Sequence, residues 1–143
     1  MKKWILLLIG TMVLLMVGCV TGEKQIKQTS LEEQEIFQLF SEMQSAWNKQ
    51  DTDTYITFWH PDLRLKLGTP QKPKYFSKAE YAKVLPQRMA DFGPYKMVNP
   101  KILKIEGDNA KVKVTIRKSH RDYKNIFNLL REDGRWRIVS NEW

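Results

Sequence analysis

The amino-acid sequence predicts one α+β domain in which helices cover one face of a curved antiparallel sheet. Between residues 30 and 93, apolar side chains recur mainly at helical spacing, and two stretches open with capping motifs. From Tyr95 onwards, apolar and polar side chains alternate, as they do in half-buried strands. Because the apolar side of such strands must be covered, we expect the amphipathic helices to pack against it.

The first and clearest predicted helix runs from residue 30 to residue 50. Ser30 and Glu33 form a capping box, in which each side chain satisfies a free backbone N–H of the first turn. Apolar residues then recur along one side at Ile36, Phe40, Met43 and Trp47. One face of this helix is therefore expected to be buried.

The next segment predicts a short helix, a strand and a loop. The stretch "DTDTYITFWHPDL" at residues 51–63 is typical of a short helix that Pro61 ends. "LRLKL" at residues 63–67 alternates apolar and basic residues and predicts a strand, and "GTPQKP" at residues 68–73 predicts a loop.

A third helix is predicted over residues 77–93. It opens with a second capping box, Ser77 and Glu80, and ends at Gly93. Pro86 lies inside it and is expected to kink or split the helix, because proline lacks the N–H for the helical hydrogen bond.

Two hairpins are predicted to complete the domain. One spans residues 101–118 with its turn at 107–109, and the other spans residues 125–143 with its turn at Asp133-Gly134. The charged segment "SHRDYK" between them is expected to be a solvated loop. The side chains predicted to face the helices are Ala110, Val112, Val114, Ile116, Trp136 and Ile138.

The N-terminal sequence predicts a signal peptide rather than a membrane-spanning helix. Lys2 and Lys3 precede an apolar run at residues 4–17, which is shorter than the ~20 residues of a spanning helix. The residues Met16-Val17-Gly18-Cys19 resemble the lipobox of bacterial lipoproteins. That resemblance implies cleavage before Cys19, diacylation of its sulfur and attachment to a membrane of the cell envelope, with the outer membrane favoured if the envelope has two.

The predicted organisation is therefore a signal peptide at 1–18, a lipidated cysteine with a polar tether at 19–30, and a folded domain at 31–143. Cys19 is the single cysteine, so no disulfide can form within one chain. A protein metal site would need further ligands nearby, and we expect no metal and no cofactor. The alternative is an uncleaved N-terminal anchor in which Cys19 has no role.

The charge balance is basic, with 24 Lys and Arg against 16 Asp and Glu and a net charge of +8. Export argues against nucleic acid as the partner, and the sequence shows no phosphate-binding loop or recognition motif. A basic outer sheet surface could dock to anionic lipid or an acidic partner, or could simply be a solvated, protected face. Its predicted members are Lys111, Lys113, Arg117, Arg131, Arg135 and Arg137.

Three steps of the sequence carry a family resemblance. "WNKQD" leads from the first predicted helix into the second, "FWHPD" ends the second, and "DGRWRI" opens the last strand. Together with the long capped helix, this pattern resembles the nuclear transport factor 2-like superfamily, which includes polyketide-cyclase-like and ketosteroid-isomerase-like proteins. The resemblance implies a cone-shaped α+β barrel: a strongly curved sheet wrapped around N-terminal helices, with a pocket at its open end.

Enzymes of that superfamily move a proton with an Asp or a His-Asp pair inside the cone. The acids and bases available here are His60, Asp62, His120 and Asp122, but none matches a catalytic motif of the family residue by residue. His60 and Asp62 flank Pro61 and are weak catalytic candidates with ready structural explanations.

Five aromatic residues could line the pocket or simply fill the core of a small domain. They are Tyr55, Trp59, Tyr81, Trp136 and Trp143. The sequence thus favours a membrane-tethered, non-catalytic lipoprotein that binds a small apolar ligand or an envelope protein. An isomerase, dehydratase or cyclase with His60 as general base is the alternative. A third possibility is an interaction domain that forms homodimers through its sheet face.

Overall fold

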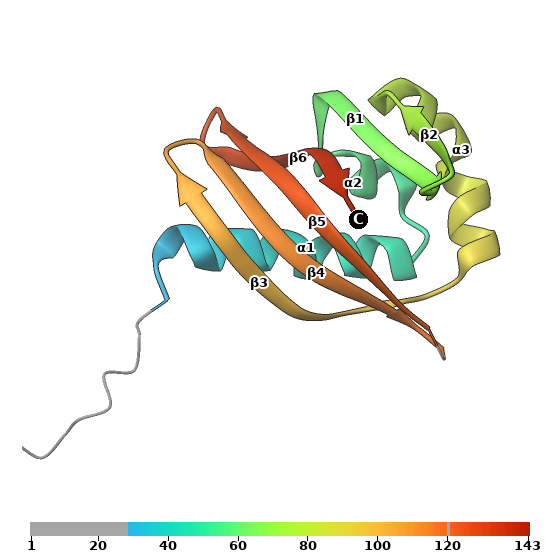
Figure 1. Cartoon of the computed structure of the whole chain (residues 1–143), viewed down its shortest axis with the longest axis horizontal. Helices are drawn as coiled ribbons and strands as arrows, with labels where there is room; N and C mark the ends of the chain where they lie inside the picture. Colours follow the sequence, from blue (N-terminus) through green and yellow to red (C-terminus); the bar gives the residue numbers. More distant parts are fainter. Residues whose placement is uncertain (1–28, 120) are drawn as a thin grey trace, which may run out of the picture.

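The computed structural model describes residues 29–119 and 121–143 (Figure 1). Three helices, α1 (Leu31–Asn48), α2 (Thr52–Ile56) and α3 (Lys78–Phe92), occur among its elements. The strands of this part of the chain are β1 (Trp59–Thr69), β2 (Lys72–Phe76), β3 (Lys96–Glu106), β4 (Asn109–Lys118), β5 (Arg121–Glu132) and β6 (Arg135–Glu142). The predicted α+β class is confirmed.

The strands form one curved sheet with the order β2-β1-β6-β5-β4-β3. Neighbouring strands are antiparallel except β1 and β6, which run parallel, so the sheet is mixed. Figure 1 shows α1 crossing one face of strands β3 to β6, while β1, β2 and α3 gather at the end of the molecule where α1 finishes. This arrangement leaves the two ends of α1 in different surroundings.

Helix α1 forms as its sequence predicts. The Ser30 hydroxyl accepts the Glu33 N–H, and the Glu33 carboxylate accepts the Ser30 N–H, so both halves of the capping box are present. The residues of the predicted apolar stripe are buried, and they pack with the inward side chains of the strands in a single core cluster. The core members predicted for β4 and β6 are buried, except Ile116, which is half-buried at its edge.

The second helix is shorter than the sequence predicts, and Trp59 to Pro61 belong to a strand instead. The register of β1 against β6 shifts between Trp59, opposite Ile138, and Arg64, opposite Ser140. Pro61 falls in this irregular stretch, where its missing N–H removes no regular ladder bond. Pairing with a strand almost 80 residues later in the chain overrides the local helical pattern.

Three further expectations need correction. Residues 68–73 are the turn and flanking residues of a β1–β2 hairpin, and β2 was not predicted at all. Segment 119–124 is not all loop, because β5 begins at Arg121 and pairs with β4 from its first residue. Pro86 does not split α3, which runs unbroken from Lys78 to Phe92.

The connection from α3 to β3 is fastened to the C-terminal end of α1. The Trp47 Nε1 donates to the Gly93 carbonyl at 2.9 Å. The Asn48 side chain donates to the Tyr95 carbonyl and accepts the Tyr95 N–H, both at 2.9 Å. These bonds fix Tyr95 and the end of α3 beside the end of α1.

The opposite end of the cone is closed by Arg131. Its Nη1 donates to Glu32 at 2.9 Å, its Nε donates to Asp108 at 3.1 Å, and its guanidinium lies 5.1 Å from the ring centroid of Trp136. Arg131 therefore faces α1 and joins the first turn of that helix to the β3–β4 turn. It lies on the helix side of the sheet, not on the predicted basic outer surface.

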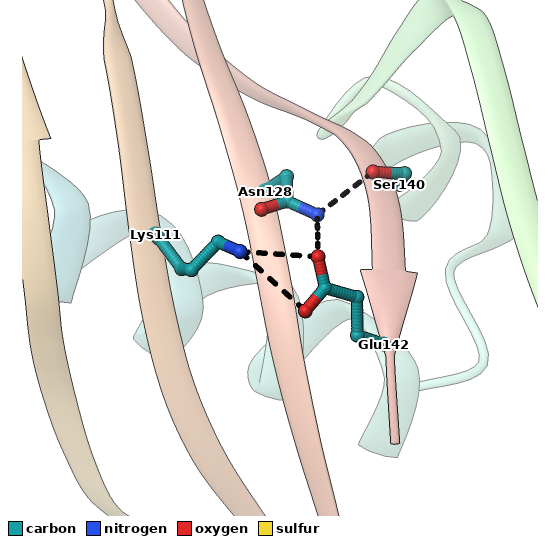
Figure 2. A network of polar contacts seen from close by, with 4 residues as sticks. All are labelled: Lys111, Asn128, Ser140 and Glu142. Carbon is teal, nitrogen blue, oxygen red and sulfur yellow. Dashed lines mark hydrogen bonds and ion pairs between the residues drawn. The ribbon is translucent and has the colours of Figure 1, made fainter.

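The outer sheet surface is less uniformly basic than the sequence predicts, since β5 separates β4 from β6. Figure 2 shows Lys111, Asn128, Ser140 and Glu142 in one network on the face of the sheet opposite α1. The Lys111 ammonium donates to Glu142 at 3.1 Å, and Asn128 donates to both Glu142 and Ser140. Glu142 thus neutralises one of the predicted surface cations, and Asp122 pairs with another, Arg117.

Candidate functional site

A cavity of about 520 Å³ lies at the end of the cone where α1 finishes. Its wall combines the C-terminal part of α1, helices α2 and α3, the β1–β2 turn and the ends of β5 and β6. The lining side chains include Met43, Trp47, Tyr55, Trp59, Leu65, Leu67, Tyr81, Arg88, Phe92, Tyr95, Ile116, Asp122, Tyr123, Lys124, Asn125, Phe127, Asn141 and Trp143.

Aromatic rings form a continuous part of this wall. Tyr55 lies between two tryptophans, with centroid distances of 5.3 Å to Trp47 and 5.9 Å to Trp59. Trp59 in turn meets Tyr81 edge to face at 5.4 Å. Tilted and edge-to-face contacts of this kind hold the rings in fixed orientations, so the wall presents preformed flat and edge surfaces to a ligand.

Three buried tyrosine hydroxyls add polarity to the aromatic wall. Burial raises the pKa of Tyr55, Tyr81 and Tyr95 above the ordinary tyrosine value. At Tyr81, hydrogen bonding with Tyr55 and the charge and hydrogen bonding of the neighbouring Arg88 partly offset this effect on the pKa. The three hydroxyls are therefore neutral at physiological pH and can donate hydrogen bonds.

Several donors of the cavity wall have no hydrogen-bond partner in the described part of the chain. They are the Trp59 Nε1, the Arg88 Nε and the Tyr95 hydroxyl, all of them shielded from solvent. A buried donor without a partner is destabilising by about 1–3 kcal/mol. The cavity thus carries polar groups that the fold itself does not use.

The mouth is fastened where β1 separates from β6. The Asn141 amide accepts the Lys66 N–H at 2.7 Å and donates to the Lys66 carbonyl at 2.9 Å. Trp143 donates to the same carbonyl at 3.3 Å, and the Lys66 ammonium lies 4.0 Å from its ring centroid. The last residue of the sequence therefore closes the final strand onto β1.

His60 is buried but does not line the cavity. Its Nδ1 accepts the Asp62 N–H at 3.0 Å, which leaves the proton on Nε2, 2.7 Å from a Glu132 carboxylate oxygen. Both ring nitrogens are thus engaged: Nδ1 within the irregular part of β1, and Nε2 in joining it to the end of β5. The Asp62 carboxylate is almost fully exposed.

Asp122 lies at the rim of the cavity, and His120 lies outside the described residues. Arg117 donates to both Asp122 carboxylate oxygens, at 2.8 and 2.9 Å. These hydrogen bonds lower the pKa of Asp122 and keep it ionised. Among the described residues, no group of three His, Cys, Asp or Glu side chains is placed to hold a metal ion.

Four of the five aromatic candidates named from the sequence line the cavity: Tyr55, Trp59, Tyr81 and Trp143. Trp136 lies outside the lining, under the Arg131 guanidinium. Sequence reasoning missed Trp47, Arg88, Tyr95, Asn125 and Asn141. Arg88 had a usable signal, because it lies two helical turns after Tyr81 and next to the buried stripe of α3.

The comparisons with known proteins agree with this fold. Residues 32–143 match the model of a family described as "Putative lumazine-binding". No curated protein matches the sequence.

Solved structures show the same architecture. A nuclear transport factor 2-like protein from Shewanella baltica superposes with a TM-score of 0.63 at 19% identity, covering 77% of this chain and 90% of its own. One from Cytophaga hutchinsonii gives 0.65 at 13%, covering 78% and 96%. A chain from Novosphingobium aromaticivorans described as "Putative Scytalone Dehydratase" gives 0.60 at 15%, covering 78% and 81%. At these identities the likeness shows the fold, which is nuclear transport factor 2-like.

We predict that the three cavity tyrosines resist ionisation while the domain is folded. Because burial raises their pKa in the folded state, stability should be fully present below about pH 10, the value for a free tyrosine, and should fall as the pH rises above it. A titration followed by tyrosinate absorbance should show at most two of the five tyrosines ionising before urea-monitored unfolding begins. A third tyrosine ionising in the folded domain would contradict this prediction.

We also predict that Tyr95→Phe stabilises the ligand-free domain by about 1 kcal/mol, because the buried hydroxyl that it removes lies near the Tyr55 hydroxyl but makes no hydrogen bond of good geometry. Urea denaturation of the two proteins measures this difference. Tyr75→Phe is the matched control, since the Tyr75 ring is 49% exposed and lies outside the cavity. A loss of stability in Tyr95→Phe would mean that the hydroxyl is bonded in the folded protein.

Proposed function

The chain belongs to the family whose model it matches over residues 32–143, and we propose that it is a ligand-binding protein whose cavity holds a small aromatic molecule. We further propose that a lipid on Cys19 tethers it to a membrane of the cell envelope. The cavity is the observation that supports the binding function, since it is preformed and walled mainly by aromatic and aliphatic side chains.

The size and shape of the cavity suit a compact, flat ligand. Its volume of about 520 Å³ lies within the ~300–1,000 Å³ common for small-molecule sites. The rings of Trp47, Tyr55 and Trp59 contribute aromatic surface to the wall, which suits contact with a ring system. Lumazine, which the description of the family names, is a flat bicyclic heteroaromatic molecule and belongs to this class of ligand.

Binding is supported better than acid–base catalysis. His60, the general base of the alternative hypothesis, lies outside the lining and has both nitrogens engaged. Asp122 reaches the rim but is held as a carboxylate by Arg117. The tyrosines are kept neutral by burial. Among the described residues, this arrangement supplies contacts for a ligand and no base positioned over it.

The tether follows from the sequence around Cys19, which lies outside the described residues. No helix in the described part of the chain is long and apolar enough to cross a membrane. Helix α1 begins at the closed end and has 18 residues, so a tether entering at Ser30 would join the domain about 27 Å from the end that lies at the cavity. Lipid attachment there would leave the cavity mouth accessible to molecules in the envelope space.

We predict that the soluble segment Val20–Trp143, purified from cells without detergent, carries a bound small molecule. Native mass spectrometry should show a reproducible extra mass on the domain that disappears on denaturation. Leu67→Trp should remove it, because the larger ring fills part of the cavity from its half-buried wall. Leu103→Trp is the matched control, since Leu103 is 43% exposed on β3 and away from the lining.

The binding proposal would be contradicted if the protein shows only its own mass and still binds nothing when aromatic compounds are added. The envelope-protein alternative would then be the one to pursue, by isolating partners from membranes. Loss of the extra mass in Leu103→Trp alone would instead point to a ligand on the exposed surface of β3.

For the tether, we predict that the mature full-length protein begins at Cys19 and carries acyl chains on it. Mass spectrometry of the N-terminal peptide from membrane-extracted protein measures both features, and Cys19→Ser should lack the modification. A chain that keeps Met1 and a free Cys19 thiol would favour the uncleaved-anchor alternative.

A further inference from the structure

We propose that the cavity selects ligands that carry an anionic, hydrogen-bond-accepting group, and that Arg88 is the residue that binds this group. The inference rests on the proposed function and specifies the ligand class. It comes from the three unpartnered donors of the wall, Trp59 Nε1, Arg88 Nε and the Tyr95 hydroxyl.

The chemistry of these donors points in one direction. An indole Nε1 and a guanidinium Nε can only donate, and a neutral tyrosine hydroxyl can donate as well as accept. A purely apolar ligand would displace water from the cavity and leave all three without acceptors. A ligand with acceptor oxygens would give them partners while its rings contact the aromatic wall.

The charges around the cavity favour an anion over a neutral acceptor. The ion pairs among the described residues do not include Arg88. Asp122 is the single carboxylate among the described lining residues, and its two oxygens already accept from Arg117. The guanidinium of Arg88 therefore has no carboxylate partner among the described residues, although it interacts with the nearby Tyr81 hydroxyl. Its planar fork matches carboxylate, sulfonate or phosphate oxygens.

The contrast with the closed end of the cone strengthens this argument. Arg131, at that end, bonds two carboxylates and lies over an aromatic ring, so the fold uses its charge fully. Arg88 has a buried Nε without a partner, in a cavity of ligand size. A structural arginine would be expected to resemble Arg131. Arg88 instead fits a side chain kept for a ligand.

Two fluorescent probes separate the anionic group from the rings that carry it. 8-Anilinonaphthalene-1-sulfonate and N-phenyl-1-naphthylamine share the same arylamine and differ in one sulfonate. Both should bind the segment Val20–Trp143, and the sulfonate should bind more tightly. This segment contains the whole family-matched region, and the Cytophaga protein, covered over 96% of its chain, is a fold of this kind standing alone.

Arg88→Met should lower the affinity for the sulfonate probe by about 10- to 100-fold, the effect of losing one charge-assisted hydrogen bond. It should change the affinity for the neutral amine probe by less than about threefold. Arg88→Lys should fall between the two, because it keeps the charge without the planar fork. Arg135→Met is the matched control: it removes one positive charge from an exposed position on β6 and should leave the preference for the sulfonate unchanged. Tyr95→Phe, which we expect to be stable, gives a second test and should weaken the sulfonate selectively.

The outcomes separate the two proposals. If the neutral amine binds but the sulfonate has no advantage, or keeps its advantage in Arg88→Met and Tyr95→Phe, the anion inference is overturned and the binding function stands. If neither probe binds and Leu67→Trp changes nothing, the proposed function fails and this inference fails with it.

Discussion

The packing of α1 against the concave face of the sheet is the constraint on which the rest of the structure depends. The stripe of Ile36, Phe40, Met43 and Trp47 meets the inward side chains of β4, β5 and β6 in one core. A single helix covers only part of a sheet of six strands, so the strands curve around it and extend past its end. The space beyond the end of α1 is what α2, α3 and the β1–β2 hairpin enclose, and it remains as the cavity.

The two ends of α1 show how the same sheet meets opposite requirements. At the N-terminal end, the charged groups are paired and the cone is sealed by Arg131. At the C-terminal end, aromatic rings hold the wall rigid while three donors go without partners. Unpaired buried donors lower stability, and rigid surroundings are needed to keep them in place. The paired charges at the closed end contribute stability, which offsets the cost of the unpaired donors at the open end.

Much of the fold could be predicted because its strongest signals are local. The two capping boxes and the helical stripes located α1 and α3, and the alternation around Val112 and Val114 located β4. The errors fall where distant pairing decides. Trp59 joins a strand since Ile138 pairs with it, and β2, whose side chains are mostly exposed, has no clear alternation to recognise. For the cavity, the sequence indicated which aromatic residues were present but not which of them line it. Trp59 lies in the cavity wall and Trp136 lies under Arg131, and this difference is decided by tertiary packing.

The polar residues of the site were harder to find for a related reason. Arg88 and Tyr95 become significant through what they lack, which is a partner, and that property exists only after every other donor and acceptor has been placed. Arg88 and Arg131 illustrate the point. Their neighbours in the sequence do not indicate that Arg131 bonds two carboxylates while the Nε of Arg88 has no partner. The two ends of α1, one beside Arg131 and the other at the cavity, lie about 27 Å apart, estimated from its 18 residues. The proposed membrane tether at its first residue and the proposed ligand site at its last can act independently, so attachment would determine where the protein works without altering what its cavity selects.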